Sequence, residues 1–274
     1  MSSACVRSLL RQSPLPRLET QMLLQYALDV SRVWLIAHDT DALEAAQLAR
    51  YESLLARRLA GEPMAYLIGH REFMGYDFKV EPGVLIPRPE TELLVEVAVA
   101  ELARRGVEKP RVLDLGTGSG AIAVSVALAR PDAVVVATDL SATALDVARR
   151  NANALGAQVT FLQGSWFEAL AGQPAFDLIV SNPPYIHSSD PHLKHGDLRY
   201  EPAAALTDGG DGLGALAHIV THAPQWLTPG GGLWMEHGYD QAAAVRRLLQ
   251  AAGFKYVNSH IDLAGIERIS GGNL

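Results

Sequence analysis

Cysteine is almost absent from the chain, which has one, Cys5, among 274 residues. A single thiol excludes a disulfide framework or a cysteine-based metal site within one chain. No apolar run approaches the roughly 18 residues of a membrane-spanning helix. The first residues also lack the basic start, apolar run and small-residue cleavage site of a signal peptide. We therefore expect a cytoplasmic protein without membrane association, in which Cys5 lies in a loose N-terminal segment.

Positive charge is also scarce. Lys and Arg number 23 against 30 Asp and Glu, which gives a net charge of −7 and a pI of about 5.7. Tight binding to nucleic-acid backbones depends on Lys and Arg that neutralise phosphates, so this balance argues against a direct nucleic-acid partner. Hydrophobic residues make up 49% and charged residues 19%, proportions of a folded globular protein that exclude wholesale disorder.

Three regions follow one another along the chain. Residues 1–65 are expected to form a small helical bundle, because apolar residues recur at helical spacing between about Leu18 and Leu59. Residues 66–88 contain strand-forming residues around the Pro82-Gly83 turn, which predicts a β-hairpin linker. Residues 89–274 alternate strand and helix patterns and form the third domain.

The third region predicts an α/β fold. Strands are expected at residues 111–115, 133–139, 159–162, 177–181, 232–236, 254–258 and 265–270. Helices are expected at residues 121–130, 141–155, 214–227 and 241–252, and Ser141 is the expected N-cap of the second. Repeated strand–helix units predict a doubly wound, mostly parallel, seven-stranded sheet.

The stretch Asn182-Pro183-Pro184-Tyr185 follows a predicted buried strand. Each proline fixes φ and lacks a backbone N–H, so the amide of Asn182 and the ring of Tyr185 are held in fixed directions. They lie at the C-terminal end of a strand, where open α/β sheets bind their ligands. A planar amide, free backbone carbonyls and a flat ring predict a receptor for a planar NH₂ group. This pattern by itself leaves adenine and glutamine equally open.

A glycine loop at residues 116–120 connects the first predicted strand to the first predicted helix of the third region. Gly116, Gly118 and Gly120 let the backbone approach a ligand closely and present N–H groups at a helix N-terminus. Together with Ala121, the loop also satisfies the dinucleotide pattern G-x-G-x-x-[G/A]. Taken alone, it does not separate a nicotinamide cofactor from S-adenosyl-L-methionine.

Two aspartates flank this loop. Asp139 ends the second strand, where it would accept hydrogen bonds from both ribose hydroxyls of either cofactor or cap the following helix. Asp114 lies in the strand before the loop. A carboxylate there suits a cationic group and would repel a pyrophosphate, so it favours S-adenosyl-L-methionine, which carries an amino group and a sulfonium. The alternative is that Asp114 caps the loop's own N–H groups.

Together, the Asp-x-Gly-x-Gly-x-Gly loop, the acid after the second strand and the tetrapeptide resemble class I amino methyltransferases. Residues 85–92 (Leu-Ile-Pro-Arg-Pro-Glu-Thr-Glu), 199–202 (Arg-Tyr-Glu-Pro) and 236–238 (Glu-His-Gly) narrow the resemblance, as do the hairpin and the helical bundle. From about residue 18 to 270 the chain resembles the release factor glutamine methyltransferase family. Its members N5-methylate the glutamine of the Gly-Gly-Gln motif in class I peptide chain release factors.

The resemblance implies a Rossmann-like class I methyltransferase domain that uses S-adenosyl-L-methionine and releases S-adenosyl-L-homocysteine. It implies a release factor as the protein substrate, docked with help from the N-terminal bundle, and we expect a monomer. The implied cofactor-binding residues are Asp114, Gly116, Thr117, Gly118, Ser119, Gly120, Asp139, Trp166 and Asn182. The implied substrate-binding residues are Arg88, Glu90, Asn182, Pro183, Pro184 and Tyr185, of which Asn182, Pro183 and Tyr185 are catalytic.

Some of these residues have a second explanation. Trp166 would otherwise pack in the core. Arg88 and Glu90 precede or begin a predicted helix with Pro89 at its first position and acidic residues in its first turn, which is also what a helix start favours. His187, His192 and His195 follow the tetrapeptide, but their spacing matches no metal motif and no metal is expected.

Three rival functions remain open. The first is methylation of a glutamine in a large-subunit ribosomal protein, which shares the chemistry and the tetrapeptide. The second is N6 methylation of adenine in nucleic acid, against which the acidic charge and the absence of a Lys/Arg stripe in the bundle weigh. The third, a non-catalytic nucleotide-binding module, leaves Asn182–Tyr185 unexplained.

Overall fold

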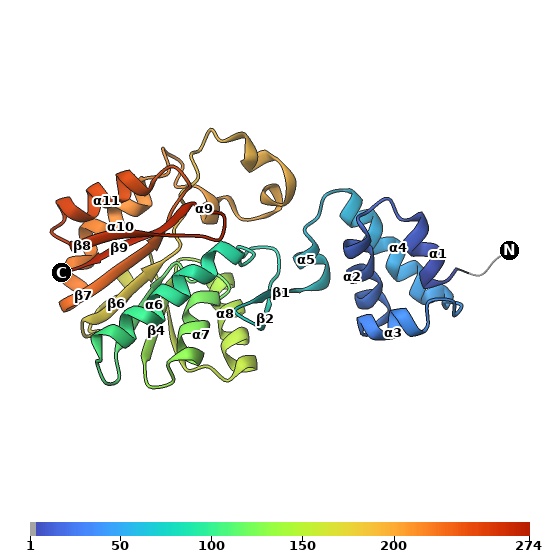
Figure 1. The fold of residues 1–274 in the computed structure, drawn as a ribbon, viewed down its shortest axis with the longest axis horizontal. Helices are drawn as coiled ribbons and strands as arrows, with labels where there is room; N and C mark the ends of the chain where they lie inside the picture. Colours follow the sequence, from blue (N-terminus) through green and yellow to red (C-terminus); the bar gives the residue numbers. More distant parts are fainter. Residues whose placement is uncertain (1–3) are drawn as a thin grey trace. The chain divides into compact units, whose positions relative to one another are not determined.

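The computed structural model describes residues 4–274, which divide into two compact units with a boundary between His70 and Arg71. This boundary lies inside the segment that the sequence predicts to be a linker. Figure 1 shows a helical smaller unit and a larger unit built around a sheet.

The smaller unit is a helical bundle. Its helices are α1 (Val6–Gln12), α2 (Arg17–Leu28), α3 (Arg32–Ala37), α4 (Ala45–Leu59) and α5 (Met64–Ile68). Apolar residues at helical spacing bring Leu23, Leu24, Tyr51 and Leu54 into one buried core. The predicted bundle is therefore confirmed.

The start of this bundle differs from the expectation of a loose N-terminus. Cys5 is the half-buried N-cap of α1, and Val6 is fully buried in the core beside Leu23. Leu9 and Leu10 also pack against this core, so α1 is held by the apolar positions of its own helical turn. Burial of these side chains offsets the entropy of ordering the segment, and the expectation of a loose segment was wrong.

A β-hairpin follows, formed by β1 (His70–Phe73) and β2 (Tyr76–Lys79). Its turn consists of Met74 and Gly75, which both have positive φ, as a two-residue type I′ turn requires. The hairpin is confirmed, but its predicted turn at Pro82-Gly83 was wrong, because those residues follow β2. β2 ends at Lys79, and Pro82, which lacks the N–H that strand pairing needs, lies beyond the paired residues.

The larger unit contains a seven-stranded sheet in the order β5-β4-β3-β6-β7-β9-β8. The strands are β3 (Arg111–Leu115), β4 (Val134–Asp139), β5 (Val159–Gln163), β6 (Phe176–Ser181), β7 (Leu227–Glu236), β8 (Lys255–Ile261) and β9 (Glu267–Asn273). The first five of these pair in parallel, whereas β9 is antiparallel to both β7 and β8. The predicted doubly wound, mostly parallel sheet is confirmed.

Helices cover both faces of this sheet (Figure 1). One face packs against α6 (Glu92–Arg105), α7 (Ala121–Ala129) and α8 (Ala142–Leu155), and the other against α10 (Gly214–His222) and α11 (Ala242–Ala251). In β6, Leu178 and Val180 join the first core and Ile179 joins the second. Side chains of a strand alternate between faces, so a strand buried on both sides must be apolar throughout.

The helix predicted at residues 214–227 is shorter than expected. It ends at His222 and is followed by a 3₁₀ turn, η5 (Ala223–Trp226), before β7 begins at Leu227. Pro224 explains this end, because proline lacks an N–H and clashes with the carbonyl four residues earlier in a helix. Across residues 4–274, no helix combines the length and the apolar character needed to cross a membrane.

The register of the sheet aligns the carboxyl ends of four neighbouring strands. Leu115 of β3 pairs with Thr138 of β4 on one side and with Ser181 of β6 on the other. Ser181 in turn pairs with Met235 of β7. The chain runs outward from β3 to β5 and then returns to the opposite side of β3 as β6. The sheet therefore reverses its strand order between β3 and β6, which is where such sheets open a ligand crevice.

Candidate active site

Four residues follow the aligned row directly: Asp139 at the end of β4, Gly116 after β3, Asn182 after β6 and Glu236 at the end of β7. They lie at one edge of the sheet, next to the reversal between β3 and β6. Neighbouring strands are about 4.8 Å apart, so the four residues share a single site. Three of them were expected from the sequence, and Glu236 was not.

The glycine loop crosses this edge with a backbone that favours glycine. Gly116, Gly118 and Gly120 have φ of 72°, 56° and 84°. The backbone N–H groups of Gly116 and Thr117 both donate to the carbonyl of Thr138, each at 2.9 Å. The loop is thus tied to the neighbouring strand β4, and it enters α7 with Gly120 as the N-cap.

Asp139 supports the glycine loop through a hydrogen bond. Its Oδ2 accepts a hydrogen bond from the Gly118 N–H at 2.9 Å, and its Oδ1 accepts one from the Ser141 N–H at 2.8 Å. Ser141 caps α8, as predicted, by accepting from the Ala144 N–H. Burial raises the pKa of Asp139, and these backbone N–H groups oppose the rise. The N-cap of α8 is thus Ser141, whose N–H Asp139 accepts, and the contact of Asp139 with a ribose stays a prediction.

A cavity of about 440 Å³ lies over this edge. Its wall includes Gly116, Gly118, Asp139, Trp166 and Asn182. The carboxylate of Asp139 provides a hydrogen-bond acceptor on this wall, and the glycines leave the backbone accessible because they carry no side chain. The cavity therefore brings together residues from four separate segments of the sequence that were expected to bind the cofactor.

Trp166 follows β5 with a φ of 48°, an uncommon backbone conformation for a residue with a side chain. The hydroxyl of Thr138 donates a hydrogen bond to its carbonyl at 3.2 Å, which helps to hold that conformation. The ring lines the cavity and also packs against the core on the α10 side. Trp166 therefore packs in the core, as its second explanation predicts, and its contact with adenine stays a prediction.

Asp114, Thr117, Ser119 and Gly120 lie behind the cavity wall rather than on it. Asp114 is fully buried, and its Oδ2 accepts a hydrogen bond from the Thr117 hydroxyl at 2.6 Å. Burial raises the pKa of this carboxyl to about 7. In this arrangement Asp114 supports the loop from beneath through Thr117.

The tetrapeptide begins where β6 ends. The hydroxyl of Ser181 donates to the Leu115 carbonyl at 2.7 Å, which ties the end of β6 to β3. The next residue, Asn182, donates from Nδ2 to the hydroxyl oxygen of Thr91 at 3.1 Å. Thr91 is buried in the 3₁₀ turn η1 (Pro89–Thr91) and was not expected at the site. The only indication of its role in the sequence was that Thr91 belongs to residues 85–92, which contributed to the family resemblance.

Tyr185 is held at both ends. Its hydroxyl donates to Glu236 Oε1 at 2.8 Å, and its carbonyl accepts from Gln241 Nε2 at 3.0 Å. Burial raises the pKa of Tyr185, and the neighbouring Glu236 raises it further. Burial likewise raises the pKa of Glu236, which the nearby hydroxyls of Thr91 and Tyr185 oppose. Glu236 and Gln241 were also missed, although residues 236–238 contributed to the resemblance.

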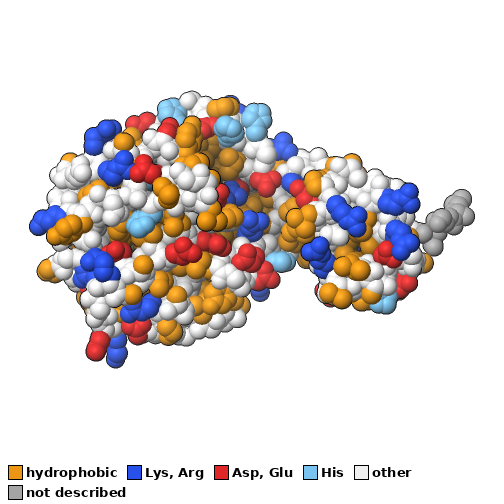
Figure 2. All heavy atoms as spheres, in the orientation of Figure 1, with side chains coloured by type: hydrophobic (Ala, Val, Ile, Leu, Met, Phe, Trp, Pro, Cys, Tyr) orange, Lys and Arg blue, Asp and Glu red, His pale blue; other side chains and the backbone are white. Residues whose placement is uncertain are grey.

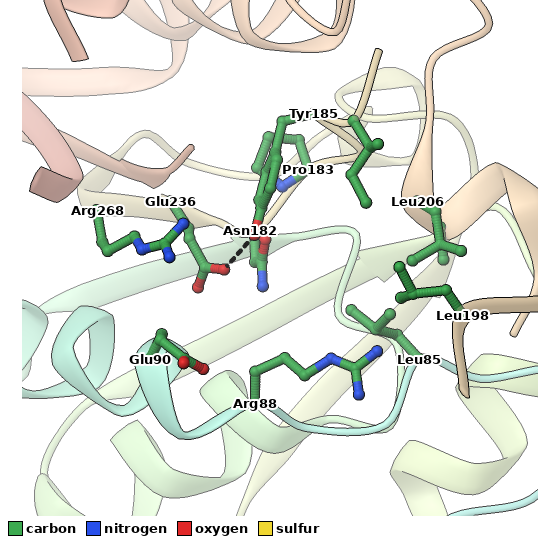
Figure 3. Close-up of a pocket in the computed structure, with 12 residues that line it drawn as sticks. Leu85, Arg88, Glu90, Asn182, Pro183, Tyr185, Leu198, Leu206, Glu236 and Arg268 are labelled. Carbon is green, nitrogen blue, oxygen red and sulfur yellow. Dashed lines mark hydrogen bonds between the residues drawn. The ribbon is translucent and has the colours of Figure 1, made fainter. Parts of the chain in front are cut away.

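A second cavity of about 250 Å³ adjoins the tetrapeptide (Figure 3). It is lined by Leu85, Arg88, Glu90, Asn182, Pro183, Tyr185, Ile186, Leu198, Ala205, Leu206, Glu236 and Arg268. Asn182 and Pro183 line both this smaller cavity and the larger one. These two residues therefore stand at the boundary between the two spaces.

Comparisons with known proteins show which family this chain belongs to. The model described as the PrmC N-terminal domain matches residues 4–69, and the methyltransferase small domain matches residues 89–213. The release factor glutamine methyltransferase of Bordetella pertussis is 62% identical over 269 residues, which cover 98% of this chain and 99% of the relative. The chain belongs to the release factor glutamine methyltransferase family. The resemblance drawn from the sequence motifs is confirmed.

A second relative supports this family, and a solved structure matches the fold. The release factor glutamine methyltransferase of Burkholderia pseudomallei is 56% identical over 279 residues, covering 100% of this chain and 97% of the relative. A solved methyltransferase structure from Pyrococcus furiosus matches with a TM-score of 0.54 and 18% identity, over 81% of this chain and 98% of that chain. At this identity the solved structure shows the fold alone.

In this member of the family, Arg88 and Glu90 both line the smaller cavity. The guanidinium of Arg88 pairs with the Glu201 carboxylate, which also accepts the Ile86 N–H at 3.1 Å. Pro89 begins η1 and Glu90 lies in its first turn. Pro89 and Glu90 therefore match the expected helix start, whereas substrate binding by Arg88 and Glu90 stays a prediction. The pair of Arg88 and Glu201 also joins two of the segments, 85–92 and 199–202, that the sequence marked separately.

The histidines that follow the tetrapeptide make local contacts. His187 Nδ1 lies 2.9 Å from the Ser189 hydroxyl, and His192 Nδ1 lies 2.7 Å from Asp190 Oδ1. Within the part of the chain that the structure describes, no group of three or more His, Cys, Asp or Glu side chains is arranged to hold a metal ion. His192 instead pairs with the aspartate that begins its own 3₁₀ turn.

Proposed function

We propose that this protein transfers a methyl group from S-adenosyl-L-methionine to the side-chain amide nitrogen of the glutamine in the Gly-Gly-Gln motif of class I peptide chain release factors. Membership of the release factor glutamine methyltransferase family supports the substrate. The observation that carries the proposal is the position of Asn182 and Pro183, which form a wall common to both cavities. A methyl donor in the larger cavity and an amide in the smaller one would meet at this wall.

The residues around the larger cavity fit the proposed cofactor. The Asp139 carboxylate would accept hydrogen bonds from two ribose hydroxyls, and the flat ring of Trp166 would lie against the adenine. Gly116 and Gly118 would let the cofactor approach the backbone closely. When bound, S-adenosyl-L-methionine supplies a methyl group on a positively charged sulfonium. Asp114 would act on the cofactor through the loop that it supports.

Asn182 and Pro183 would orient the target amide. An amide nitrogen is a poor nucleophile because its lone pair is delocalised into the carbonyl. The Asn182 Nδ2 is engaged by Thr91, so Oδ1 is the atom of that amide left to accept a hydrogen from the substrate. The Pro183 carbonyl would accept the second hydrogen. With both hydrogens held, the remaining face of the nitrogen would turn toward the larger cavity, and this orientation would supply most of the rate gain.

Tyr185 would support the amide from one side. Its hydroxyl and its carbonyl are both held by hydrogen bonds, so the ring has a fixed direction at the smaller cavity. There it would pack on the planar amide and offer its π face to the positive charge of the reacting groups. The nitrogen would lose its proton to water late in the transfer.

We propose a separate role for each of three segments of the chain. Residues 1–65 would help to dock the protein substrate, residues 66–88 would link, and residues 89–274 would carry the reaction. Release factors act on ribosomes, so we place the reaction in the cytoplasm, and we propose that the enzyme works as a monomer. On the face of the larger unit drawn in Figure 2, Lys and Arg are interspersed with Asp and Glu, which favours a protein substrate over a nucleic-acid strand.

A labelling experiment tests this function. The protein is incubated with methyl-labelled S-adenosyl-L-methionine and a purified release factor, with and without the Gln→Ala change in Gly-Gly-Gln. Label should appear on the unchanged release factor and disappear with the change. Label retained on the altered release factor would contradict the proposal. A large-subunit ribosomal protein fraction and an adenine-containing oligonucleotide, assayed in parallel, test the rival substrates.

The role of Asn182 is tested in the same assay. Asn182→Ala should lower kcat by about 100-fold or more, because both proposed contacts to the amide depend on its position. The dissociation constant for S-adenosyl-L-methionine, measured by calorimetry, should change little. Unchanged turnover by this variant would show that the amide is oriented by other groups.

A further inference from the structure

Glu236 has one carboxylate oxygen without a hydrogen bond. The residue is 1% exposed, and its Oε1 accepts the Tyr185 hydroxyl. In the region described by the structure, no group donates a hydrogen bond to Oε2. Interaction with the Thr91 hydroxyl lowers the pKa of Glu236, and Oε2 is the oxygen of this carboxylate that is left without a partner. Buried carboxylate oxygens are normally satisfied, so the unused acceptor points to a missing partner.

The carboxylate of Glu236 faces the smaller cavity. In Figure 3 it points into the space between Tyr185 and Glu90, and all three residues line that cavity. The two arginines of the cavity have other partners: Arg88 pairs with Glu201, and Arg268 donates to Asp262 at 3.2 Å. The missing partner of Oε2 is therefore expected to come from whatever occupies the cavity.

The place of Glu236 relative to Asn182 identifies this occupant as part of the substrate. The two residues follow Ser181 and Met235, which pair across neighbouring strands about 4.8 Å apart. A glutamine whose amide is held at Asn182 would therefore have its adjacent chain within reach of Glu236. The cavity, at about 250 Å³, is much larger than the roughly 30 Å³ of one water molecule, so it has room for more than a bridging water.

The free oxygen of Glu236 needs a hydrogen-bond donor from the occupant of the cavity. Both arginines of the wall, Arg88 and Arg268, are already paired with carboxylates that lie outside it. An ionised carboxylate has no hydrogen to donate, so its oxygens act only as hydrogen-bond acceptors. In a protein segment, the neutral donor present at every residue except proline is the backbone N–H.

We propose that Glu236 is a substrate-binding residue whose free carboxylate oxygen accepts a hydrogen bond from a backbone N–H of the segment that carries the target glutamine. This inference rests on the proposed function and deepens it. The contact makes the main chain around the glutamine part of what is recognised. A flipped base presents no peptide N–H, and a glutamine whose neighbouring backbone runs in another direction would leave Oε2 unpaired.

Glu236→Gln tests this contact. The variant keeps the size of the side chain, and its amide oxygen still accepts the Tyr185 hydroxyl, which directs an N–H donor into the cavity. The side-chain N–H of the variant would then face the backbone N–H of the substrate, and two donors cannot form a hydrogen bond. KM for the release factor should rise by about tenfold or more, because a hydrogen bond to a charged group is lost. The dissociation constant for S-adenosyl-L-methionine should not change. An unchanged KM would overturn the proposal.

Tyr185→Phe is the matched control, because it removes the other partner of Glu236 and leaves Oε2 in place. If Glu236 binds the substrate, the double variant should have a KM about tenfold above that of Tyr185→Phe alone. If Glu236 acts only by holding Tyr185, the double variant will be no worse than Tyr185→Phe, which would refute a direct contact. Melting temperatures confirm that each variant is folded.

Backbone esters provide a test with the unaltered enzyme. A semisynthetic release factor segment has single peptide bonds next to the glutamine replaced by esters, which removes one N–H at a time. One ester should raise KM for the enzyme about tenfold and have little further effect on Glu236→Gln. If none raises KM, Glu236 does not bind a backbone N–H. Failure of the enzyme to methylate the unmodified release factor would instead refute the proposed function.

Discussion

The side-chain amide of Asn182 donates a hydrogen bond to the hydroxyl oxygen of Thr91 at 3.1 Å, although 91 residues of sequence separate them. An asparagine amide can turn over and exchange its oxygen and nitrogen. The bond to Thr91 holds the amide in place, and with Nδ2 as its donor it leaves Oδ1 available to an amide hydrogen of the substrate. A residue that contacts neither substrate nor cofactor in our proposal thus sets the orientation of the amide acceptor.

Removal of the Thr91 hydroxyl should therefore slow methyl transfer. Thr91→Val keeps the shape of the side chain but offers no acceptor to Asn182. We expect kcat to fall about tenfold, because the hydrogen bond, worth about 1 kcal/mol, is lost and the Asn182 amide is no longer held in its orientation. Thr91→Ser keeps the hydroxyl and should restore most of the rate. Steady-state kinetics with the release factor measure both. Equal rates for the Val and Ser variants would show that Asn182 is oriented without Thr91.

Gly212 controls the position of Tyr185 from the other side. Its φ is 81°, and a side chain there would collide with the Tyr185 carbonyl. We expect Gly212→Ala to lower stability by about 1–3 kcal/mol through backbone strain and to reduce kcat by displacing the tetrapeptide. Gly210→Ala is the neighbouring control, because a Cβ there meets only Asp208 at ordinary contact distance. Urea unfolding and kinetics should separate the two variants, and similar behaviour would contradict the prediction.

Asp139 should contribute directly to cofactor affinity. Asp139→Asn removes the charge and one of the two acceptors at the cavity wall, so the dissociation constant for S-adenosyl-L-methionine should rise about 10–100-fold. Asp146→Asn makes the same change at an exposed position of the helix that follows and should leave the constant unaltered. Calorimetric titration of both variants provides the measurement. An unaltered affinity in Asp139→Asn would assign Asp139 to loop support alone.

Asp114 should make stability depend on pH. Its pKa is raised to about 7 in the folded protein, so the folded state prefers the protonated carboxyl and loses stability as the pH rises from about 4 to 7. Asp114→Asn keeps an acceptor for Thr117 but cannot ionise. It should stabilise the protein at pH 8 by at most about 4 kcal/mol and have little effect at pH 4. Urea unfolding at the two pH values checks this. The same difference at both would contradict a raised pKa.

The Arg88–Glu201 pair should be important for stability because Glu201 is buried. Arg88→Ala would leave that carboxylate without its charged partner, at a cost of about 3–5 kcal/mol. The double variant Arg88→Ala/Glu201→Gln has no unpaired charge and should recover part of this loss. Urea unfolding of the single and double variants gives the comparison. If the double variant is as unstable as Arg88→Ala, an unpaired charge is not the cause.

Much of the fold was predictable because its signals are local. The strand at residues 111–115, the helix start at Ser141 and the tetrapeptide at a strand end all depend on residues a few positions apart. The errors were local too. Val6 begins a helix instead of lying in a loose segment, the turn that contains Pro224 follows the end of a helix, and Met74-Gly75 forms the hairpin turn.

By itself, the sequence of this protein determined which segments are strands and helices, and where an amide receptor and a glycine loop must lie along the chain. These features follow from side-chain periodicity, proline geometry and glycine φ. Only the tertiary structure decided that Thr91 orients Asn182, that Glu236 holds Tyr185 while keeping one oxygen free, and that Asp114 lies beneath the loop. Those contacts depend on the register and order of the strands, which the packing of the whole sheet determines.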